Sequence, residues 1–337
     1  MIQIGVIGYG YWGPNLVRNC MSAPGSVVVA VCDLLEERLH ALRKLYPGLR
    51  TQTDPIALIN DAEVQAVVIA TPVATHFDLA MAALRAGKHV LVEKPLASNS
   101  EHAQELIAEA QARNLVLLVD HTFVYTDVVR KMRALIASGA LGEIFYYDAV
   151  RVNLGLFQHD VNVIWDLAIH DLSIMDYVLP KKPIAISATG ISNVPGQPEN
   201  VAYITLFFAE TQIAHIHVNW LTPVKVRHTL IGGSEKMIVY DDLEPSEKLK
   251  VYDKGITVTP GTEDVYKLLV SYRSGDMWAP RLDNTEALQT EAIHFVDCIE
   301  NHKEPETDGL AGLRMVKMIE AAERSLHRRG ELIEIEL

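Results

Sequence analysis

Two residues in the middle of this 337-residue chain have the types and spacing needed to move a proton to or from a hydroxyl group. Asp166 and His170 are four positions apart within an apolar segment, so a helix would place them on one face, one turn apart. A carboxylate at that distance orients an imidazole and favours its protonated form, which suits a histidine general acid or base. A helix-terminal aspartate beside a structural core histidine has the same spacing, so the pair alone leaves both interpretations open.

Lys94 follows the apolar run His89–Val92 and Glu93, where a buried strand is expected to end. A lysine there faces the crevice in which parallel sheets bind ligands, and partial burial frees an amine to hydrogen-bond a hydroxyl or carbonyl group. Pro95 restricts Lys94 to an extended backbone conformation. The residue types are therefore consistent with a functional lysine, and equally with a structural one.

A glycine pattern at the start of the chain predicts a dinucleotide site. The apolar run Ile2–Ile7 is expected to form a buried strand, and Gly8, Gly10 and Gly13 follow it where a helix can begin. In such a pattern the glycines permit a tight turn, close approach to a pyrophosphate and close packing of helix on strand. Asp33 ends the next apolar run, 20 positions after Gly13, where an acidic residue binds the adenosine ribose.

Asp33 favours NAD over NADP, because a carboxylate accepts hydrogen bonds from the free ribose hydroxyls. Arg38 lies five positions further on, where it can meet a 2′-phosphate or be a solvated helix residue. Further cofactor contacts are expected near the ends of the next two strands, at Thr71, Pro72, His76, Glu93, Lys94 and Pro95.

The elements that carry these residues alternate over the first third of the chain. Strands are expected at 2–7, 27–32, 66–70, 89–92 and 115–119, and helices at 14–19, 34–46, 54–59, 75–86 and 100–113, the last capped by Ser100. This alternation predicts a doubly wound parallel sheet over residues 1–121, an α/β Rossmann domain. Its strand ends would place Gly8, Asp33, Thr71, Lys94 and His121 around one crevice, with His121 on the substrate side.

Residues 122–337 are expected to form an α+β domain with a large, open-faced, mainly antiparallel sheet. Helices are expected at 127–138, 163–177, 284–301 and 309–328, strands at 144–152, 203–208, 213–220, 227–231 and 236–240, and mostly loop at 241–283. We expect the last two helices to pack back on the first domain and a second subunit to cover the open sheet face. His215 and His217 share one side of a strand, a spacing more typical of sheet residues than of a metal pair.

Composition excludes several classes of partner. The formal net charge of −13 disfavours binding to nucleic acid or to an anionic membrane. The three cysteines lack metal-ligand spacing and are expected to be free, and no metal site is expected. No apolar run approaches the length of a membrane span, so we expect a cytoplasmic protein.

Taken together, these motifs resemble the glucose–fructose oxidoreductase/inositol dehydrogenase/MocA family over nearly the whole chain. The resemblance rests on the glycine pattern, Asp33, Ala70-Thr71-Pro72, Glu93-Lys94-Pro95 and the stretch from Asp166 to His170. It implies a homodimer or homotetramer formed through the C-terminal sheet.

The resemblance also implies hydride transfer between nicotinamide C4 and a carbinol carbon of a sugar, cyclitol or nucleotide-activated sugar. His170 would take the hydroxyl proton, Lys94 would hydrogen-bond the reacting oxygen, and Asp166 would orient substrate and histidine. Tyr11 and Trp12 would lie near nicotinamide and substrate.

The expected substrate is a nucleotide-linked or free hexose of bacterial surface-sugar metabolism. Two stretches resemble family members that act in bacterial surface-sugar biosynthesis. They are the residues after Gly10 and the stretch from Arg151 to Gly155, which includes Asn153. Arg151 and Asn153 are thus expected substrate contacts. The alternatives are an inositol or cyclitol dehydrogenase, an NAD-sensing regulatory protein without turnover, and a redox-neutral NAD-dependent glycosidase.

Overall fold

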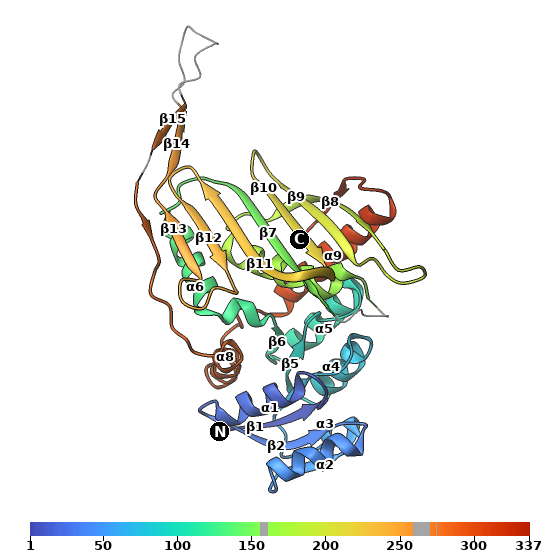
Figure 1. Ribbon diagram of the computed structural model, residues 1–337. Helices are drawn as coiled ribbons and strands as arrows, with labels where there is room; N and C mark the ends of the chain where they lie inside the picture. Colours follow the sequence, from blue (N-terminus) through green and yellow to red (C-terminus); the bar gives the residue numbers. More distant parts are fainter. Residues whose placement is uncertain (156–160, 259–269, 274) are drawn as a thin grey trace. The chain divides into compact units, whose positions relative to one another are not determined.

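The computed structural model describes residues 1–155, 161–258, 270–273 and 275–337, which form two compact units (Figure 1). The first unit comprises residues 1–126 and 285–320, and the second comprises residues 127–284 and 321–337. Both units are therefore discontinuous in sequence. The turn at Thr122–Tyr125 belongs to the first unit, because the Tyr125 hydroxyl hydrogen-bonds the Thr307 hydroxyl at 2.9 Å.

The first unit is built on a parallel sheet of six strands in the order β3-β2-β1-β4-β5-β6. The strands are β1 (Ile2–Ile7), β2 (Ser26–Cys32), β3 (Arg50–Gln52), β4 (Ala66–Ile69), β5 (His89–Glu93) and β6 (Leu117–Asp120). Their Val, Ile and Leu side chains are buried on both faces, as expected of a sheet with helices on both sides. This is the strand order of the doubly wound dinucleotide-binding fold, and the order reverses between β1 and β4.

The helices of the first unit come from both ends of the chain. They are α1 (Gly13–Ser22), α2 (Glu36–Leu45), α3 (Pro55–Ile59), α4 (His76–Arg85), α5 (Ser100–Ala112) and α8 (Ala287–Asn301), with residues 309–320 of α9 (Gly309–His327). Phe295 of α8 is buried in the same apolar cluster as Leu16 of α1. The expected cap of α5 was wrong by one residue, since the Asn99 side chain accepts the His102 amide at 2.8 Å.

The second unit contains a nine-stranded sheet in the order β16-β13-β12-β11-β7-β10-β9-β8-β17. Its strands are β7 (Ile144–Leu154), β8 (Pro183–Ile191), β9 (Val201–Phe208), β10 (Ile213–Asn219), β11 (Leu221–Gly233), β12 (Met237–Asp241), β13 (Leu249–Tyr252), β16 (Met277–Trp278) and β17 (Ile333–Glu334). Neighbours are antiparallel except β7 and β10, so the sheet is mixed but mostly antiparallel. The strands β14 (Gly255–Val258) and β15 (Val270–Arg273) form a separate pair.

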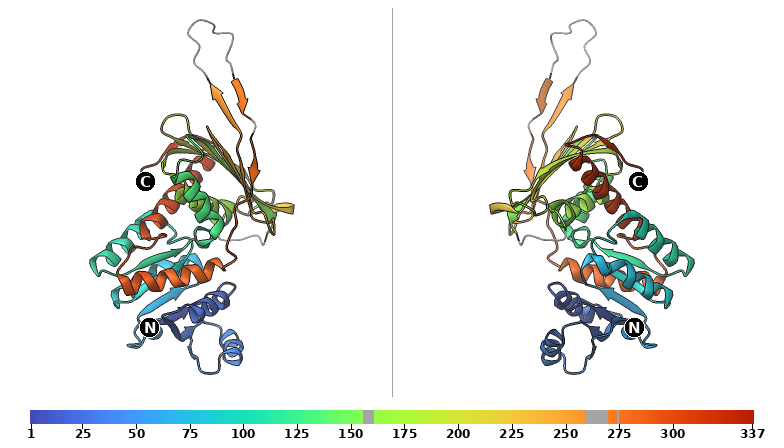
Figure 2. Two further views of the ribbon diagram at one scale, coloured as in Figure 1. Left: turned by 90° about the vertical axis from the view of Figure 1, so that its left-hand side faces the viewer. Right: turned by 90° about the vertical axis from the view of Figure 1, so that its right-hand side faces the viewer.

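Among the described residues, helices cover one face of this sheet and leave the other open. The covering elements are α6 (Asp127–Ala137), a π-helix at Ile164–Ala168 and α7 (Ile169–Val178), and the edge-on views of Figure 2 show them on one side. On the open side, Tyr203, Phe207 and Ile213 remain more than a third exposed. His215 and His217 share that side with Tyr203, whose ring stacks on that of His217 with centroids 4.4 Å apart.

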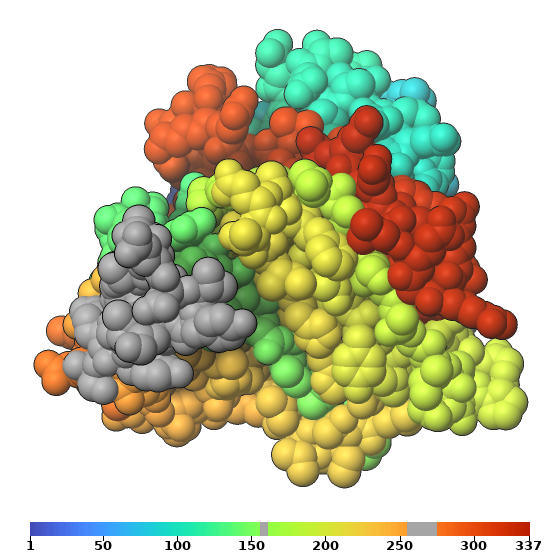
Figure 3. Space-filling model, turned by 90° about the horizontal axis from the view of Figure 1, so that it is seen from above, coloured from blue at the N-terminus to red at the C-terminus, as the bar shows by residue number. Residues whose placement is uncertain are grey.

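Several short strands of the second unit were not predicted from the sequence. Residues 241–283 were expected to be mostly loop, but β13 and β16 extend the sheet edge there; residues 259–269 lie outside the described residues. At the other edge, β17 pairs with β8, and Figure 3 shows the dark red C-terminal residues beside the yellow-green segment.

In the part of the chain that the structure describes, no helix is both long and apolar enough to cross a membrane. Nor do the described residues contain three or more His, Cys, Asp or Glu side chains arranged to hold a metal ion.

Candidate active site

The turn after β1 is built so tightly that two of its glycines are required by packing. Gly8 has φ of +98°, and a Cβ on it would lie 2.4 Å from the Ala70 carbonyl oxygen. A Cβ on Gly13 would lie 2.3 Å from the Gly8 carbonyl oxygen. The strand end and the first turn of α1 therefore pack together directly, as the glycine pattern predicted.

Gly10 has no such packing constraint, which makes it the more informative glycine. The nearest atom to a Cβ on Gly10 would be Arg38 Nη1 at 3.5 Å, an ordinary contact distance. The first turn of α1 holds no acidic side chain, and its cap residue Trp12 makes no side-chain cap. An uncapped helix N-terminus beside a glycine with free space fits a pyrophosphate, because the unpaired amides and the helix dipole attract an anion.

Asp33 lies at the end of β2, beside this turn. Its Oδ2 accepts the Tyr9 amide at 2.7 Å and its Oδ1 accepts the Leu35 amide at 2.9 Å, which fixes the carboxylate plane. Arg38 Nη1 lies 3.3 Å from the same Oδ2, so Arg38 is paired with Asp33. Tyr11 and Trp12 are exposed, and their rings meet edge to face with centroids 5.4 Å apart.

His76 connects the two strand ends that follow. Its Nδ1 lies 2.8 Å from the Pro95 carbonyl oxygen and its Nε2 lies 2.8 Å from the Thr71 carbonyl oxygen. Burial lowers the pKa of this imidazole, while its contacts with the Pro95 and Thr71 carbonyls oppose that shift. His76 therefore links the loop that follows β4 to the loop that follows β5. Pro72, in the first of these loops, is exposed.

Lys94 is half-buried and directly follows the buried Glu93; its peptide bond to Pro95 is cis. Glu93 forms a cluster of buried carboxyl groups with Asp120 at the end of β6 and Glu291 on α8. Burial and then the nearby charge of Asp120 raise the pKa of Glu93 and of Glu291 well above the usual glutamate value. A side-chain hydrogen bond with Asp120 adds to the rise in the pKa of both glutamates, so burial favours the protonated form of each.

His121 follows Asp120 and is only 2% exposed. The Thr122 amide and hydroxyl both donate to Asp120 Oδ1, which fixes the turn after β6. The first unit thus places the predicted residues Gly8, Asp33, Thr71, Lys94 and His121 after parallel strands, at one edge of the sheet.

In the second unit, Asp166 and His170 stand out by their accessibility. Every other residue from Asn162 to Asp176 is buried, and these two are half-exposed. The segment is therefore a core element with one accessible position per turn. An accessible carboxylate and imidazole on a rigid, buried segment can contact a ligand with little loss of side-chain freedom.

The turn that carries Asp166 is a π-helix, a form that is rare and frequent at functional sites. Asn162 begins it, since its Oδ1 accepts the Ile164 and Trp165 amides at 3.1 and 3.3 Å. The sequence predicted one continuous α-helix from 163 to 177, so the π-helical turn is a correction. The Val163 amide also donates to the Glu199 carbonyl at 2.9 Å, which fixes the turn against the chain before β9.

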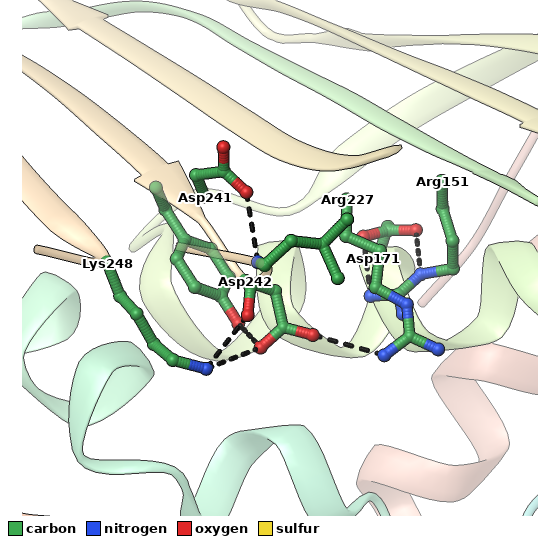
Figure 4. A network of polar contacts seen from close by, with 8 residues as sticks. Arg151, Asp171, Arg227, Asp241, Asp242 and Lys248 are labelled. Carbon is green, nitrogen blue, oxygen red and sulfur yellow. Dashed lines mark hydrogen bonds and ion pairs between the residues drawn. The ribbon is translucent and has the colours of Figure 1, made fainter. Parts of the chain in front are cut away.

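Arg151 has a different environment from the one expected of a substrate contact. It lies on β7 and makes two hydrogen bonds with Asp171, Nε to Oδ2 at 2.7 Å and Nη2 to Oδ1 at 3.0 Å (Figure 4). Both side chains are at least 96% buried, so this ion pair anchors α7 to the sheet next to His170. Asn153, two positions further along β7, is half-exposed.

One polar contact of the site was missed from the sequence. The Trp220 indole Nε1 donates to Asp166 Oδ2 at 3.0 Å across 54 positions of sequence. No local spacing signals such a contact, because it depends on how β10 ends beside the π-helical turn.

Comparison with known proteins identifies both units. The family model described as "Oxidoreductase family, NAD-binding Rossmann fold" matches residues 2–121, and that of the GFO/IDH/MocA C-terminal domain matches residues 129–239. A UDP-N-acetylglucosamine 3-dehydrogenase from Acidithiobacillus ferrooxidans is 28% identical over 94% of each chain. An inositol 2-dehydrogenase from Saccharopolyspora erythraea is 35% identical over 56% of each chain.

Solved structures agree with the family models. A structure of the Acidithiobacillus ferrooxidans UDP-N-acetylglucosamine 3-dehydrogenase is 27% identical, with a TM-score of 0.82 over 97% of this chain and 98% of the other. The two family models together match most of the chain, and the Rossmann fold named in the first agrees with the observed sheet and with the glycine turn after β1. The chain belongs to the glucose–fructose oxidoreductase/inositol dehydrogenase/MocA family of oxidoreductases and carries an NAD-binding Rossmann domain.

Proposed function

We propose that this protein is an NAD-dependent dehydrogenase that oxidises a secondary alcohol of a sugar, and that Lys94, Asp166 and His170 carry the chemistry. The observation that carries the residue assignment is the accessible pair, Asp166 and His170, on an otherwise buried segment. Lys94 adds a half-buried amine at the end of β5 in the NAD-binding domain.

Each residue has one task in the proposed reaction. Lys94 donates a hydrogen bond to the hydroxyl oxygen and steadies the negative charge that develops on it. His170 accepts the hydroxyl proton as the C–O bond becomes a carbonyl. Asp166 holds the substrate and the imidazole in line. When bound, NAD supplies the hydride acceptor, nicotinamide C4, so the two electrons of the C–H bond leave the carbinol carbon.

Cofactor binding is assigned to the first unit. The pyrophosphate would lie at the Gly10 turn and the α1 N-terminus, and the ribose hydroxyls would donate to Asp33. The pairing of Arg38 with Asp33 supports NAD rather than NADP, because that guanidinium already has a carboxylate partner.

We propose a nucleotide-linked hexose as the substrate. The relative that aligns over 94% of each chain is named for a nucleotide sugar, whereas the inositol dehydrogenase aligns over 56%. Inositol and related cyclitols are the second candidate, supported by the higher identity of that shorter match.

NADH formation with a panel of alcohols tests the proposal. The panel holds UDP-N-acetylglucosamine, UDP-glucose, free glucose and myo-inositol, each with NAD in excess. We expect the highest kcat/KM with a nucleotide-linked hexose. Tight NAD binding without turnover on any member would favour the regulatory alternative, and sugar cleavage without NADH release would favour the glycosidase.

We also propose that the protein forms a homodimer or homotetramer through the open face of its nine-stranded sheet. The support is the row of exposed apolar side chains there, with Phe207 and Ile213 paired directly across β9 and β10. Burying such a face against a second copy removes apolar surface from water.

A further inference from the structure

Trp220 is buried beside the candidate active site and contacts one of its functional groups. The side chain is 1% exposed, yet its one polar atom, Nε1, donates to Asp166 Oδ2 at 3.0 Å. A buried indole N–H needs an acceptor, and a carboxylate is a strong one because the hydrogen bond is charge-assisted.

The indole is itself held in place by its surroundings. The Trp220 amide donates to the Asn200 carbonyl at 3.0 Å, and the Trp220 carbonyl accepts the Gly155 amide at 3.1 Å. A Cβ on Gly155 would lie 2.9 Å from Trp220 Cδ1, so the backbone of Gly155 lies against the indole ring. A donor with so little freedom fixes the acceptor that it contacts.

The π-helical turn does not depend on this contact for its backbone. Asn162 and the Glu199 carbonyl already bind the amides at its start, and the Asp166 amide donates to the Asn162 carbonyl at 3.3 Å. The Asp166 carboxylate itself rotates about two side-chain bonds, and the indole N–H restricts that rotation by binding Oδ2.

We propose that Trp220 is a positioning residue for the reaction, acting through Asp166 to hold the carboxylate in the orientation that serves substrate and His170. This inference rests on the proposed function, because it requires Asp166 to take part in catalysis. It assigns to the residue between β10 and β11 a part in the site that sequence spacing does not reveal.

The decisive variant is Trp220→Phe, which keeps an aromatic ring and removes the N–H. We expect kcat to fall about tenfold, as for loss of one hydrogen bond to a charged group, with KM for NAD unchanged because the NAD residues belong to the first unit. Trp220→His restores a ring N–H and should recover part of the lost kcat. A wild-type kcat in the Phe variant would overturn the inference.

Trp165→Phe is the matched control. Trp165 lies in the same π-helical turn and is also buried, but its Nε1 faces Glu323 Oε2 at 3.4 Å. Removing that N–H should leave kcat within about twofold of wild type. An equal loss in both variants would show that any disturbance of the turn lowers activity, and would contradict a specific role of Trp220.

A double-mutant cycle separates this inference from the proposed function. If Trp220 acts through Asp166, adding Trp220→Phe to Asp166→Asn should lower kcat by less than twofold further. A full additional tenfold loss would mean a separate structural effect. Wild-type kcat in Asp166→Asn would refute the catalytic role of Asp166, and the inference with it.

A spectroscopic measurement covers the case in which Trp220→Phe does not fold. The indole N–H proton of Trp220 should resonate downfield in the wild-type protein and move upfield in Asp166→Asn, because the amide oxygen is the weaker acceptor. An unchanged resonance would contradict the contact.

Discussion

The proposed catalytic residues share one feature, which is a partly exposed side chain between buried neighbours. Lys94 is half-exposed between the buried residues Glu93 and Pro95, and His170 is half-exposed on a buried segment. Both residues are therefore partly accessible on segments whose neighbours are buried, which limits the backbone motion of a group that contacts a ligand.

Replacing either residue should stop catalysis without unfolding the protein. We expect Lys94→Ala and His170→Ala to lower kcat by about 10²-fold or more, since each removes a group to which the proposed reaction gives a contact with the hydroxyl. NADH formation with the best substrate of the panel measures it. The exposed Lys44 and His327 provide control alanine variants, and near-normal turnover in both active-site variants would refute the assignment.

His76 should matter for stability more than for chemistry. His76→Phe keeps a ring but removes the ring N–H, which donates to the Thr71 or the Pro95 carbonyl, and the loss of one buried hydrogen bond costs about 1–3 kcal/mol. Urea unfolding measures the change, with the exposed His40→Phe as control. Unchanged stability would mean that the two loops are held by other contacts.

Glu291 should make stability depend on pH. Because burial and the Asp120 charge raise its pKa in the folded state, the folded protein keeps a proton that the unfolded chain releases. Its contribution to stability is therefore lost as pH rises above about 4.5, the usual glutamate value. Glu291→Gln should stabilise the protein, and by more at pH 8 than at pH 5.

Thermal unfolding of both proteins at the two pH values tests this. A difference in Tm that is the same at both would show that Glu291 gains no proton on folding.

Among single residues, those whose position depends only on neighbouring residues in the sequence could be predicted. Gly8, Gly13 and Asp33 follow from the geometry of one strand and one turn, and the structure places them as expected. Arg151 and Trp220 take their partners, Asp171 and Asp166, from segments 20 and 54 positions away. Such contacts follow from strand order, which spacing in a single sequence does not encode.

Among the elements, the π-helix and α7 together form the rigid support of Asp166 and His170. Three contacts fix this support: Asn162 at its start, Trp220 at its carboxylate, and the Arg151–Asp171 ion pair at the first turn of α7. The Tyr147 hydroxyl adds a fourth by donating to the Asp171 carbonyl at 3.2 Å. The support is therefore tied to β7, the strand between β11 and β10 in the sheet.

Removing one partner of the buried ion pair should be costly. Arg151→Met leaves the Asp171 carboxylate buried without its guanidinium, and we expect a loss of about 3–5 kcal/mol of stability. Arg227→Met breaks the pair with Asp242, which is more exposed and also bound by Lys248, and should cost about 1 kcal/mol or less (Figure 4). Denaturant unfolding measures the loss of stability in both variants. Equal losses would contradict an anchoring role specific to Arg151.

Element prediction succeeded where burial dominates the sequence pattern. The five expected strands of the first domain correspond to β1, β2, β4, β5 and β6, because strands buried on both faces have continuous apolar runs. The strands β3, β13 and β17 have four residues or fewer and exist because a neighbouring strand pairs with them. Their own residues carry too little pattern to predict them.

For the whole molecule, the open face of the sheet makes the proposed oligomer testable. Placing a charge there by Phe207→Lys or Ile213→Lys should dissociate the assembly, because a lysine desolvated against a second copy lacks a partner. Light scattering coupled to size exclusion measures the mass. Leu310→Lys, on an exposed position of α9, is the control, and an unchanged oligomer in both sheet variants would place the interface elsewhere.

The discontinuous first unit has a consequence for how the protein is made. Its sheet is complete once residue 126 has left the ribosome, but α8, which covers Leu16 and supplies Glu291, ends at residue 301, 175 positions later. At about 5–20 residues per second, that interval lasts roughly 9–35 s. Throughout it the nascent Rossmann domain lacks α8 and exposes the apolar surface of α1, which is a surface that a chaperone can bind.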